Sequence, residues 1–548
     1  MAIMSDNATT LGAFHAQPHS TSLRSFYWRD VEFTGKDRKS QKPKTILKHV
    51  SGVVHAGHFW LSWGLHHAIE YPGTSNLVHG RSISRLVYSN GASPAPDTIR
   101  QISTYVEQEE ALVGSLTVRG TLELAARLAL PKTFGKMERI QRIDSLLAAF
   151  DLEEQADALI GTPIRKGISG GQKRRVSVAS QLITNAKLLF LDEPTSGLDS
   201  AASFDIISYI KRIAKKHGLI VIASIHQPST STFSAFDRLL LLSQGRVVYS
   251  GPKSEVQTYF HSIGNPLPHY MNPAEFIMDY IKANSTYQSI IKDQLKLVHQ
   301  TWLDSHQRAE IEEVIERVMA SKTICQDVSR GYQDQRSNNF TVLLAQVHRS
   351  FTKSHRDIVA YGIRIVMYMG LAVMMGTIWL RLSPGQDNIP SSVNPIFFGG
   401  AFMSFMAVAY IPVFLEDRAL FMRERANGLY GSTSFMIAHL LTGIPYLLII
   451  AVLVSIIAYW LSNSRPTASG FFAWVMWLFL DLVAAESLVV LIAALVPNFV
   501  VALAAAAFTN GIWTCTGGFL VTTATLNPFW RYAFHYINYQ RMCSRVRW

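Results

Sequence analysis

The sequence has few cysteines and few charged residues for its length. Its three cysteines among 548 residues, Cys325, Cys515 and Cys543, lie far apart. Their spacing indicates neither a disulfide framework nor a zinc site. The N-terminal segment lacks the apolar core of a signal peptide, which predicts that it stays in the cytosol. Charged residues make up only 16% of the chain and hydrophobic residues 48%, a balance that is unusual for a soluble protein.

The net charge is +12, and the positions of Lys and Arg in the sequence indicate whether this charge serves a nucleic acid or a membrane. A basic balance is typical of nucleic-acid-binding proteins, but here Lys and Arg gather on one predicted helix and beside long apolar runs. Cytosolic flanks of membrane helices explain that placement, because cytosolic loops are enriched in Lys and Arg. We therefore expect no nucleic-acid partner. The first three hundred or so residues are typical of a soluble α/β domain, and about the last two hundred contain the long apolar runs.

A glycine-rich turn opens the basic helix. The turn consists of Ser169, Gly170, Gly171 and Gln172. Free backbone N–H groups and the positive end of the helix dipole suit a phosphate at such a position. A glycine pair by itself is most often only a turn.

An acidic pair follows shortly after the turn. The apolar run 188–191 is expected to form a buried parallel strand that ends in Asp192 and Glu193. Ligands bind at the carboxyl ends of parallel strands, and two acids there suit a Mg²⁺ ion and a base for an attacking water. Another acid, Asp199, closes the next turn. An Asp-Glu pair after a strand is usually only a helix cap, but the ordered set of segments is specific.

In this order the segments resemble the signature, Walker B and D-loop segments of the ATP-binding cassette (ABC) family. Gln108, which follows a predicted strand, resembles the Q-loop glutamine of that family. His226, at the end of the apolar strand 219–223, resembles the H-loop histidine, although a buried strand-end histidine can also be a core residue. Residues 271–280 resemble a motif of the G subfamily, with Glu275 in place of Asp.

The resemblance fails at the phosphate-binding loop, G-x-x-x-x-G-K-[ST], whose Lys neutralises phosphates. If the loop began at Gly64, its second Gly and its Lys would fall at Ile69 and Glu70, and residues 49–131 contain no Lys at all. We expect either a reading-frame error within residues 58–80 or a genuine loss of the loop.

The first strands offer two weaker candidates. In the ABC family an aromatic side chain near the first strand stacks on adenine, and Trp28 and Phe33 are placed for this role or for the core. His58, His66 and His67 lie near the expected phosphate loop, but they lack the spacing of metal ligands, so no metal site is expected there.

The second half contains about five apolar spans, each close to or above the roughly twenty residues that cross a bilayer. Cations place the loop after the second span inside, whereas the loops after spans one and three belong outside. The charged loop 415–432 resembles the G-subfamily loop that touches the ATP-binding domain; the alternative is an ordinary cytosolic loop. Asp481 and Glu486 lie in the fourth span, where acids mark pathways or ion pairs. The spans are Ile363–Leu380, Pro395–Leu415, Ser434–Leu461, Phe471–Val496 and Val500–Leu520.

The expected fold is an α/β P-loop NTPase-type nucleotide-binding domain followed by an all-α multi-span transmembrane domain. We expect a disordered N-terminus at residues 1–24, the nucleotide-binding domain at 25–284, a helical linker at 285–340 and an ABC-2-type transmembrane domain at 341–548. The family continues into a sixth span after residue 540, so we expect the end of the chain to be truncated or misread.

The resemblance implies an ATP- and Mg²⁺-dependent half-transporter that works as a homo- or heterodimer in a membrane, with the plasma membrane favoured. It implies export of a small hydrophobic or amphiphilic substrate, such as a lipid, sterol or xenobiotic. Two alternatives stay open: a non-hydrolysing subunit that regulates a partner, and an ATPase merely anchored to a membrane. The implied catalytic residues are Glu193 and His226, the metal ligands Asp192 and Gln108, and the nucleotide-binding residues Ser169, Gly170, Gly171, Gln172, Gln108 and Asp199.

Overall fold

A computed structural model of the whole chain separates into two compact units. The first comprises Met1–Val342 together with Glu424–Tyr430, and the second comprises Leu343–Arg423 and Gly431–Trp548. The structure describes residues 23, 25–36, 43–63, 82–89, 102–108, 112–130, 134–162, 165–184, 186–225, 227–268, 272–277, 298–320, 338–357, 361–380, 389–462 and 467–540.

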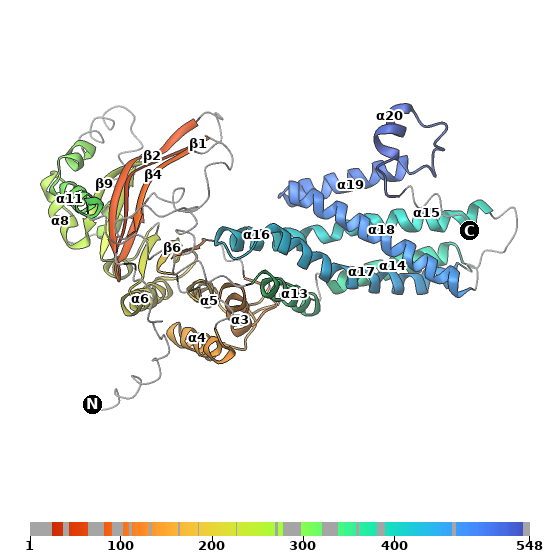
Figure 1. Cartoon of the computed structure of the whole chain (residues 1–548), viewed down its shortest axis with the longest axis horizontal. Helices are drawn as coiled ribbons and strands as arrows, with labels where there is room; N and C mark the ends of the chain where they lie inside the picture. Colours follow the sequence, from red (N-terminus) through yellow and green to blue (C-terminus); the bar gives the residue numbers. More distant parts are fainter. Residues whose placement is uncertain are drawn as a thin grey trace. The chain divides into compact units, whose positions relative to one another are not determined.

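A six-stranded sheet forms the centre of the first unit, with strand order β5-β6-β7-β3-β8-β9. Two of its strands, β6 and β9, are labelled in Figure 1. Neighbouring strands are parallel except for the pair β8 and β9, which is antiparallel. The strands from β5 to β8 are mostly buried, and β6, β7, β3 and β8 are mostly apolar, as expected for a parallel sheet covered on both faces. Their bounds are β3 Phe59–Trp63, β5 Ser103–Val106, β6 Leu188–Asp192, β7 Ile220–Ser224, β8 Arg238–Ser243 and β9 Arg246–Pro252.

A hairpin joins β8 and β9 through the turn at Gln244 and Gly245. Gln244 and Gly245 have φ values of 50° and 79°, the left-handed values that a two-residue hairpin turn requires. A Cβ atom on Gly245 would lie 1.9 Å from the carbonyl oxygen of Ile46, so a larger residue is excluded here by contact as well.

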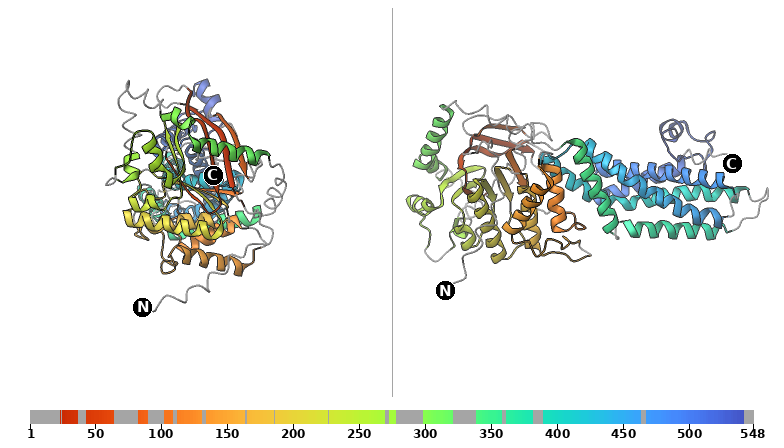
Figure 2. Two further views of the ribbon diagram at one scale, coloured as in Figure 1. Left: turned by 90° about the vertical axis from the view of Figure 1, so that its left-hand side faces the viewer. Right: turned by 60° about the horizontal axis from the view of Figure 1, so that its bottom comes forward.

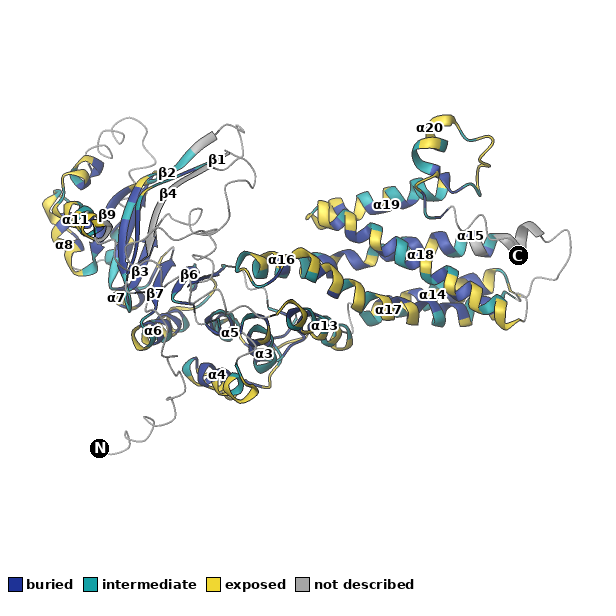
Figure 3. Cartoon of the chain, viewed as in Figure 1, coloured by how far each residue is buried: buried dark blue, intermediate teal, exposed yellow. Residues whose placement is uncertain are grey.

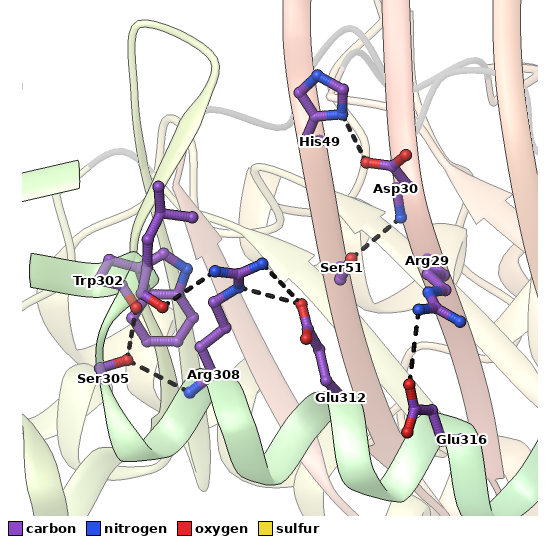
Figure 4. Close-up of polar contacts among 10 residues, drawn as sticks. Arg29, Asp30, His49, Ser51, Trp302, Ser305, Arg308, Glu312 and Glu316 are labelled. Carbon is purple, nitrogen blue, oxygen red and sulfur yellow. Dashed lines mark hydrogen bonds and ion pairs between the residues drawn. The ribbon is translucent and has the colours of Figure 1, made fainter. Parts of the chain in front are cut away.

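A second sheet of three antiparallel strands has the order β2-β1-β4, with β1 at Ser25–Lys36, β2 at Pro43–His55 and β4 at Ser82–Ser89. Helix α11 (His306–Ala320) packs against β2 and β9. Figure 4 shows this contact region, where Arg29 on β1 approaches Glu316 of α11 at 3.9 Å. Part of the expected linker is thus helical and packed in the first unit, and its Ile311 and Ile315 belong to that unit's core.

The helices of the first unit build one apolar core around the large sheet. Helix α5 begins at the glycine-rich turn, and α6 begins at the turn that contains Asp199. Helices α3 and α4 precede these two motifs, and α7 and α8 follow them. The bounds are α3 Val118–Ala129, α4 Lys136–Ala149, α5 Gly170–Leu182, α6 Ser200–His217, α7 Thr230–Ser234 and α8 Val256–Ser262.

All the secondary-structure elements that the structure describes in the second unit are helices. Its helices run side by side (Figure 2), and α17 packs against both α14 and α18. Helix α13 leads into this unit from the first. The bounds are α13 Asn339–Arg356, α14 Ile363–Ile378, α15 Ile389–Met406, η4 Ala407–Tyr410, α16 Ile411–Ala426, α17 Ser432–Leu461, α18 Ala468–Leu495, α19 Phe499–Thr516, α20 Pro528–Trp530 and a π-helical turn η5 Arg531–His535.

Four described helical segments are long and apolar enough to cross a membrane: Phe397–Ala426, Ser432–Leu461, Ala468–Leu495 and Phe499–Thr516. The first predicted span is a shorter apolar helix, α14, of 16 residues. Large apolar side chains such as Leu440, Val500 and Phe508 are exposed on these helices. Exposed residues are coloured yellow along the helices in Figure 3. Lipid contact accounts for such exposure, since soluble surfaces rarely carry large apolar patches.

The segment 415–432 differs from the charged loop that the sequence suggests. Helix α16 continues through it to Ala426, because the residues from Leu415 onward are good helix formers. The turn is confined to the residues that follow, where Gly428 has a φ of 73°. The N–H of Gly428 donates to Arg425 and the N–H of Leu429 to Glu424, so the helix ends in a compact glycine cap.

Candidate functional site

Two neighbouring strands, β5 and β6, bring the predicted Mg²⁺ ligands together. Val106 near the end of β5 pairs with Leu191 on β6 in a parallel register. Gln108 follows β5 by two residues, and the pair Asp192–Glu193 ends β6. The amide of Gln108 donates to the Glu193 carboxylate at 2.7 Å and lies 3.4 Å from Ser196 Oγ. The site thus assembles residues that are separated by some eighty positions in sequence.

The Asp192 carboxylate is held from two sides. Ser224 at the end of β7 donates its hydroxyl to Oδ1 at 2.6 Å, and Tyr105 on β5 donates its phenol to Oδ2 at 2.9 Å. The adjacent Glu193 has a left-handed φ of 42°. Its N–H donates to both the carbonyl and the hydroxyl oxygen of Ser224 at 3.1 Å. Hydrogen bonds from neighbouring strands on both sides therefore fix the backbone and the side chain of this acidic pair.

Arg174 on α5 binds the backbone of both halves of this site. Its guanidinium donates to the carbonyl oxygens of Glu107 at 3.0 Å, Gln108 at 2.6 Å and Glu193 at 3.5 Å. The side chain is only 3% exposed. The sequence marks Arg174 only as one of several cations on the helix, so its role as the connector of Gln108 and Glu193 could not be read from spacing alone.

The glycine-rich turn forms a capping box at the start of α5. Ser169 Oγ accepts from the Gln172 N–H, and Gln172 Oε1 accepts from the Ser169 N–H. A Cβ atom on Gly170 would meet nothing within 4 Å, and one on Gly171 would meet only ordinary contacts. Packing within the chain therefore does not require glycine at either position. Asp199 is likewise a cap, because its carboxylate accepts from the Ala202 N–H at 2.7 Å.

The remaining predicted features are the H-loop histidine, the phosphate loop and the aromatic residues of the first strand. His226 and the expected phosphate-loop positions 64–80 lie outside the described residues. The neighbouring Pro228 is described, and Asn272 of the 271–280 motif donates to its carbonyl oxygen at 3.1 Å. Trp28 and Phe33 are buried core residues, and Trp28 packs edge-to-face on Trp60 with ring centroids 5.4 Å apart.

The donor atoms at the end of β5 and β6 fit a Mg²⁺ ion in the presence of a nucleotide. The site offers carboxylate and amide oxygens from Asp192, Glu193 and Gln108, and oxygen ligands are the ones that Mg²⁺ prefers. Among the described residues, no group of three or more His, Cys, Asp or Glu side chains is placed to hold a metal by itself. This matches the usual protein Mg²⁺ site, in which one or two carboxylates act together with substrate phosphates.

The second unit contains buried ionic contacts of its own. Glu486 on α18 forms an ion pair with Arg364 on α14, and both side chains are almost completely buried. Asp481 accepts a hydrogen bond from Ser404 at 3.0 Å. The sequence left a pathway or an ion pair open for the acids of the fourth span, and Glu486 forms an ion pair whose partner was not identified from the sequence.

Lys353 on α13 is another buried cation, and it forms ion pairs with Asp417 at 2.7 Å and Glu416 at 3.0 Å. Burial by itself lowers the pKa of Lys353, but the two carboxylates outweigh it and hold this pKa well above its usual value. Lys353 therefore stays charged over the physiological range.

Comparisons with known proteins agree with this architecture. The model of the ABC transporter family matches residues 71–196, and two ABC-2 type transporter models match residues 341–544 and 226–362. ABC transporter G family member 1 of Petunia hybrida is 35% identical over 456 residues, which covers 80% of this chain and 70% of that protein. G family members 11 and 13 of Arabidopsis thaliana are each 33% identical to this chain. Both matches cover 80% of this chain, and they cover 65% of member 11 and 69% of member 13.

The sheet with its acidic strand end, followed by apolar helices, defines an ABC transporter with an ATP-binding domain and an ABC-2 membrane domain. It is a multi-pass membrane protein. Within this class the chain belongs to the ABC transporter G family.

Proposed function

We propose that the chain is one half of a dimeric transporter that exports hydrophobic or amphiphilic molecules, such as lipids, sterols or xenobiotics, at the expense of ATP. The observation that carries this proposal is the convergence of Gln108, Asp192 and Glu193 at one edge of the sheet, with Arg174 of the signature helix bound to two of them. The proposal places the first unit in the cytosol and the second in a membrane, with the plasma membrane favoured.

Each residue of the site has a proposed role. Bound Mg²⁺ would neutralise phosphate charge, and Asp192 with Gln108 would hold it. Glu193 takes a proton from the attacking water, a role for which its position beside Gln108 is suitable. His226 would contact the terminal phosphate. The exposed start of α5 and the cap of α6 would close on nucleotide bound by the partner subunit, through Ser169, Gly170, Gly171, Gln172 and Asp199.

A specific observation also supports the second function, a subunit that regulates a partner without hydrolysing at its own site. The positions at which the phosphate loop requires Gly, Lys and Thr are occupied by Ile69, Glu70 and Tyr71. An acid in place of the lysine repels a triphosphate where the family attracts it. The signature helix α5 and its turn are complete in this chain, so they remain available to a competent partner's nucleotide.

ATPase measurements on the purified full chain, alone and co-expressed with a second G-family half-transporter, separate these functions. For the transporter we expect hydrolysis that falls roughly 10²–10⁴-fold in Glu193→Gln, because general base catalysis contributes about that much. Hydrolysis by the homodimer of this sequence excludes the regulatory function. Activity seen only with the partner, and unchanged by Glu193→Gln in this chain, supports it.

The proposed transport itself is tested in sealed vesicles with fluorescent lipid, sterol and drug probes. Export that depends on ATP and stops in Glu193→Gln supports a transporter. ATP hydrolysis that no probe stimulates, without movement of any probe, instead supports an ATPase anchored to a membrane. Resequencing the transcript across codons 57–80 decides between a reading-frame error and a genuine loss of the phosphate loop.

A further inference from the structure

The free edge of the large sheet is completed by a side chain from a distant segment. Strand β5 is the edge strand, and the backbone N–H and C=O of its Tyr105 face away from β6. Asn427 binds both: its Oδ1 accepts from the Tyr105 N–H at 3.1 Å, and its Nδ2 donates to the Tyr105 carbonyl at 3.3 Å. The side-chain amide therefore takes the place that a peptide group of a further strand would occupy.

Asn427 belongs to a short, closed segment. Residues Glu424–Tyr430 are part of the first unit, whereas the sequence on both sides belongs to the second unit. The glycine cap at Gly428 ends α16 directly after Asn427, and the Tyr430 hydroxyl donates to the Glu424 carboxylate across the turn. These contacts limit the freedom of the turn, so a displacement of the turn carries the Asn427 amide with it.

Tyr105 also reaches the metal-binding carboxylate. Its phenol donates to Asp192 Oδ2 at 2.9 Å. One residue thus has its backbone held by Asn427 and its side chain held by Asp192. The residue is 9% exposed and lies opposite Phe190 of β6 in the strand register, so it has little room to move independently of the sheet.

Helix α5 provides a parallel connection. Gln181 Oε1 accepts from Asn427 Nδ2 at 3.1 Å and from Thr104 Oγ1 at 2.9 Å. Arg174 lies seven residues earlier, which is two turns of a helix, and therefore on the same face. It binds the backbones of Gln108 and Glu193. The amide of Asn427 is consequently linked both to Asp192 through β5 and to Glu193 through α5.

We infer that Tyr105 is a positioning residue, through which the segment 424–430 sets the orientation of the Asp192 carboxylate. The inference rests on the proposed function, because it assigns Asp192 to Mg²⁺. Hydrogen bonds through Tyr105 connect Asn427 with Asp192, which do not touch each other. Loss of the Asn427 amide should therefore loosen the Asp192 carboxylate. Loss of the Tyr105 hydroxyl should in turn loosen the segment 424–430. Groups that orient a metal ligand are typically worth 10–100-fold in metal affinity.

The first test is hydrogen exchange measured by mass spectrometry on the full chain without nucleotide. In Asn427→Ala we expect faster exchange in peptides covering 188–193 as well as 102–107. In Tyr105→Phe we expect faster exchange in peptides covering 424–430. Tyr249→Phe is the matched control, because it removes a hydroxyl that donates to Pro252 in the same unit, and it should alter neither region. Effects confined to the strand or turn that carries the substitution overturn the inference.

The second test separates positioning from a purely structural role. Mn²⁺ binding in the presence of ATP is followed by electron paramagnetic resonance, and metal-free ATP binding is measured separately. Tyr105→Phe should weaken Mn²⁺ binding roughly 10-fold with ATP affinity unchanged, and Asn427→Ala should weaken it in the same direction. Unchanged Mn²⁺ affinity in both variants overturns the inference. If the unmodified chain binds no Mn²⁺ with ATP, its proposed own nucleotide site fails, and the exchange experiment alone decides the coupling.

Discussion

At the scale of single residues, Arg174 holds the two halves of the candidate site together. A planar guanidinium with several fixed donors can bind the carbonyl groups of Glu107, Gln108 and Glu193 together. An ammonium group is a compact point charge and cannot reproduce this fork. The next residue, Arg175, binds carbonyl oxygens at Phe150 and Asp151 instead and has no contact with the site.

We expect Arg174→Lys to lower the free energy of unfolding by about 1.5–3 kcal/mol, the usual contribution of a hydrogen bond to a charged group. Thermal melting of the full chain, followed by tryptophan fluorescence, checks the stability. Hydrolysis by the active assembly should fall in Arg174→Lys and persist in the control Arg175→Lys. Equal hydrolysis by the two variants would show that the guanidinium does not organise the site.

At the scale of elements, an ion pair joins two helices of the membrane unit. Arg364 of α14 and Glu486 of α18 are 3% and 8% exposed, so neither charge is solvated when its partner is removed. The Arg364 guanidinium also lies over the rings of Tyr410 and Tyr446, at 4.9 and 5.5 Å from their centroids. The pair thus fixes which faces of the helices meet.

Glu486→Ala should destabilise the protein by about 3–5 kcal/mol, because it leaves a buried, uncompensated cation. The double variant Arg364→Met with Glu486→Leu removes both charges and should recover most of that loss. The half-life of the folded protein in detergent at elevated temperature measures both effects. Glu313→Ala is the control, because it breaks an exposed pair with Arg317, and it should cost only a few tenths of a kcal/mol. A double variant as unstable as Glu486→Ala would contradict this account.

At the scale of the whole molecule, the loop charges predict the direction of the membrane helices. Helix α17 has 30 residues, Ser432–Leu461, and a helix of that length is about 45 Å long, which exceeds a hydrocarbon core of about 30 Å. The cations before α17 predict that its first residues lie on the cytosolic side. We then expect its far end and the start of α18 on the opposite side.

Cysteine labelling checks this arrangement. In a background with Cys325, Cys515 and Cys543 replaced by Ser, Ala468→Cys should react with an impermeant maleimide in intact cells. Gly431→Cys should react only after the cells are permeabilised. Both positions are exposed, so access depends on the membrane. Labelling of both from the same side would show that α17 does not span the bilayer.

The sequence by itself was sufficient to predict the ABC fold, the apolar helices and the acidic strand end. These features are local: a buried strand, its terminal acids and a glycine-rich helix start lie within one stretch, Gly167–Asp199. Hydrophobic length likewise identifies a membrane helix without reference to other segments. The prediction that Gln108 belongs to the site came from the family pattern, and the structure brings it to Glu193.

Only the tertiary structure identified Tyr105, Asn427 and the Arg364 partner of Glu486. Their contacts join residues separated by 322 positions in one case and 122 in the other. No periodicity connects such positions, because strand order and helix packing decide which edge or face meets which. An edge strand exposes its backbone groups to whatever segment the fold places beside it, and here that segment is Glu424–Tyr430. The local sequence was thus sufficient to predict the acidic residues of the site, whereas tertiary packing determines which side chains hold them in place.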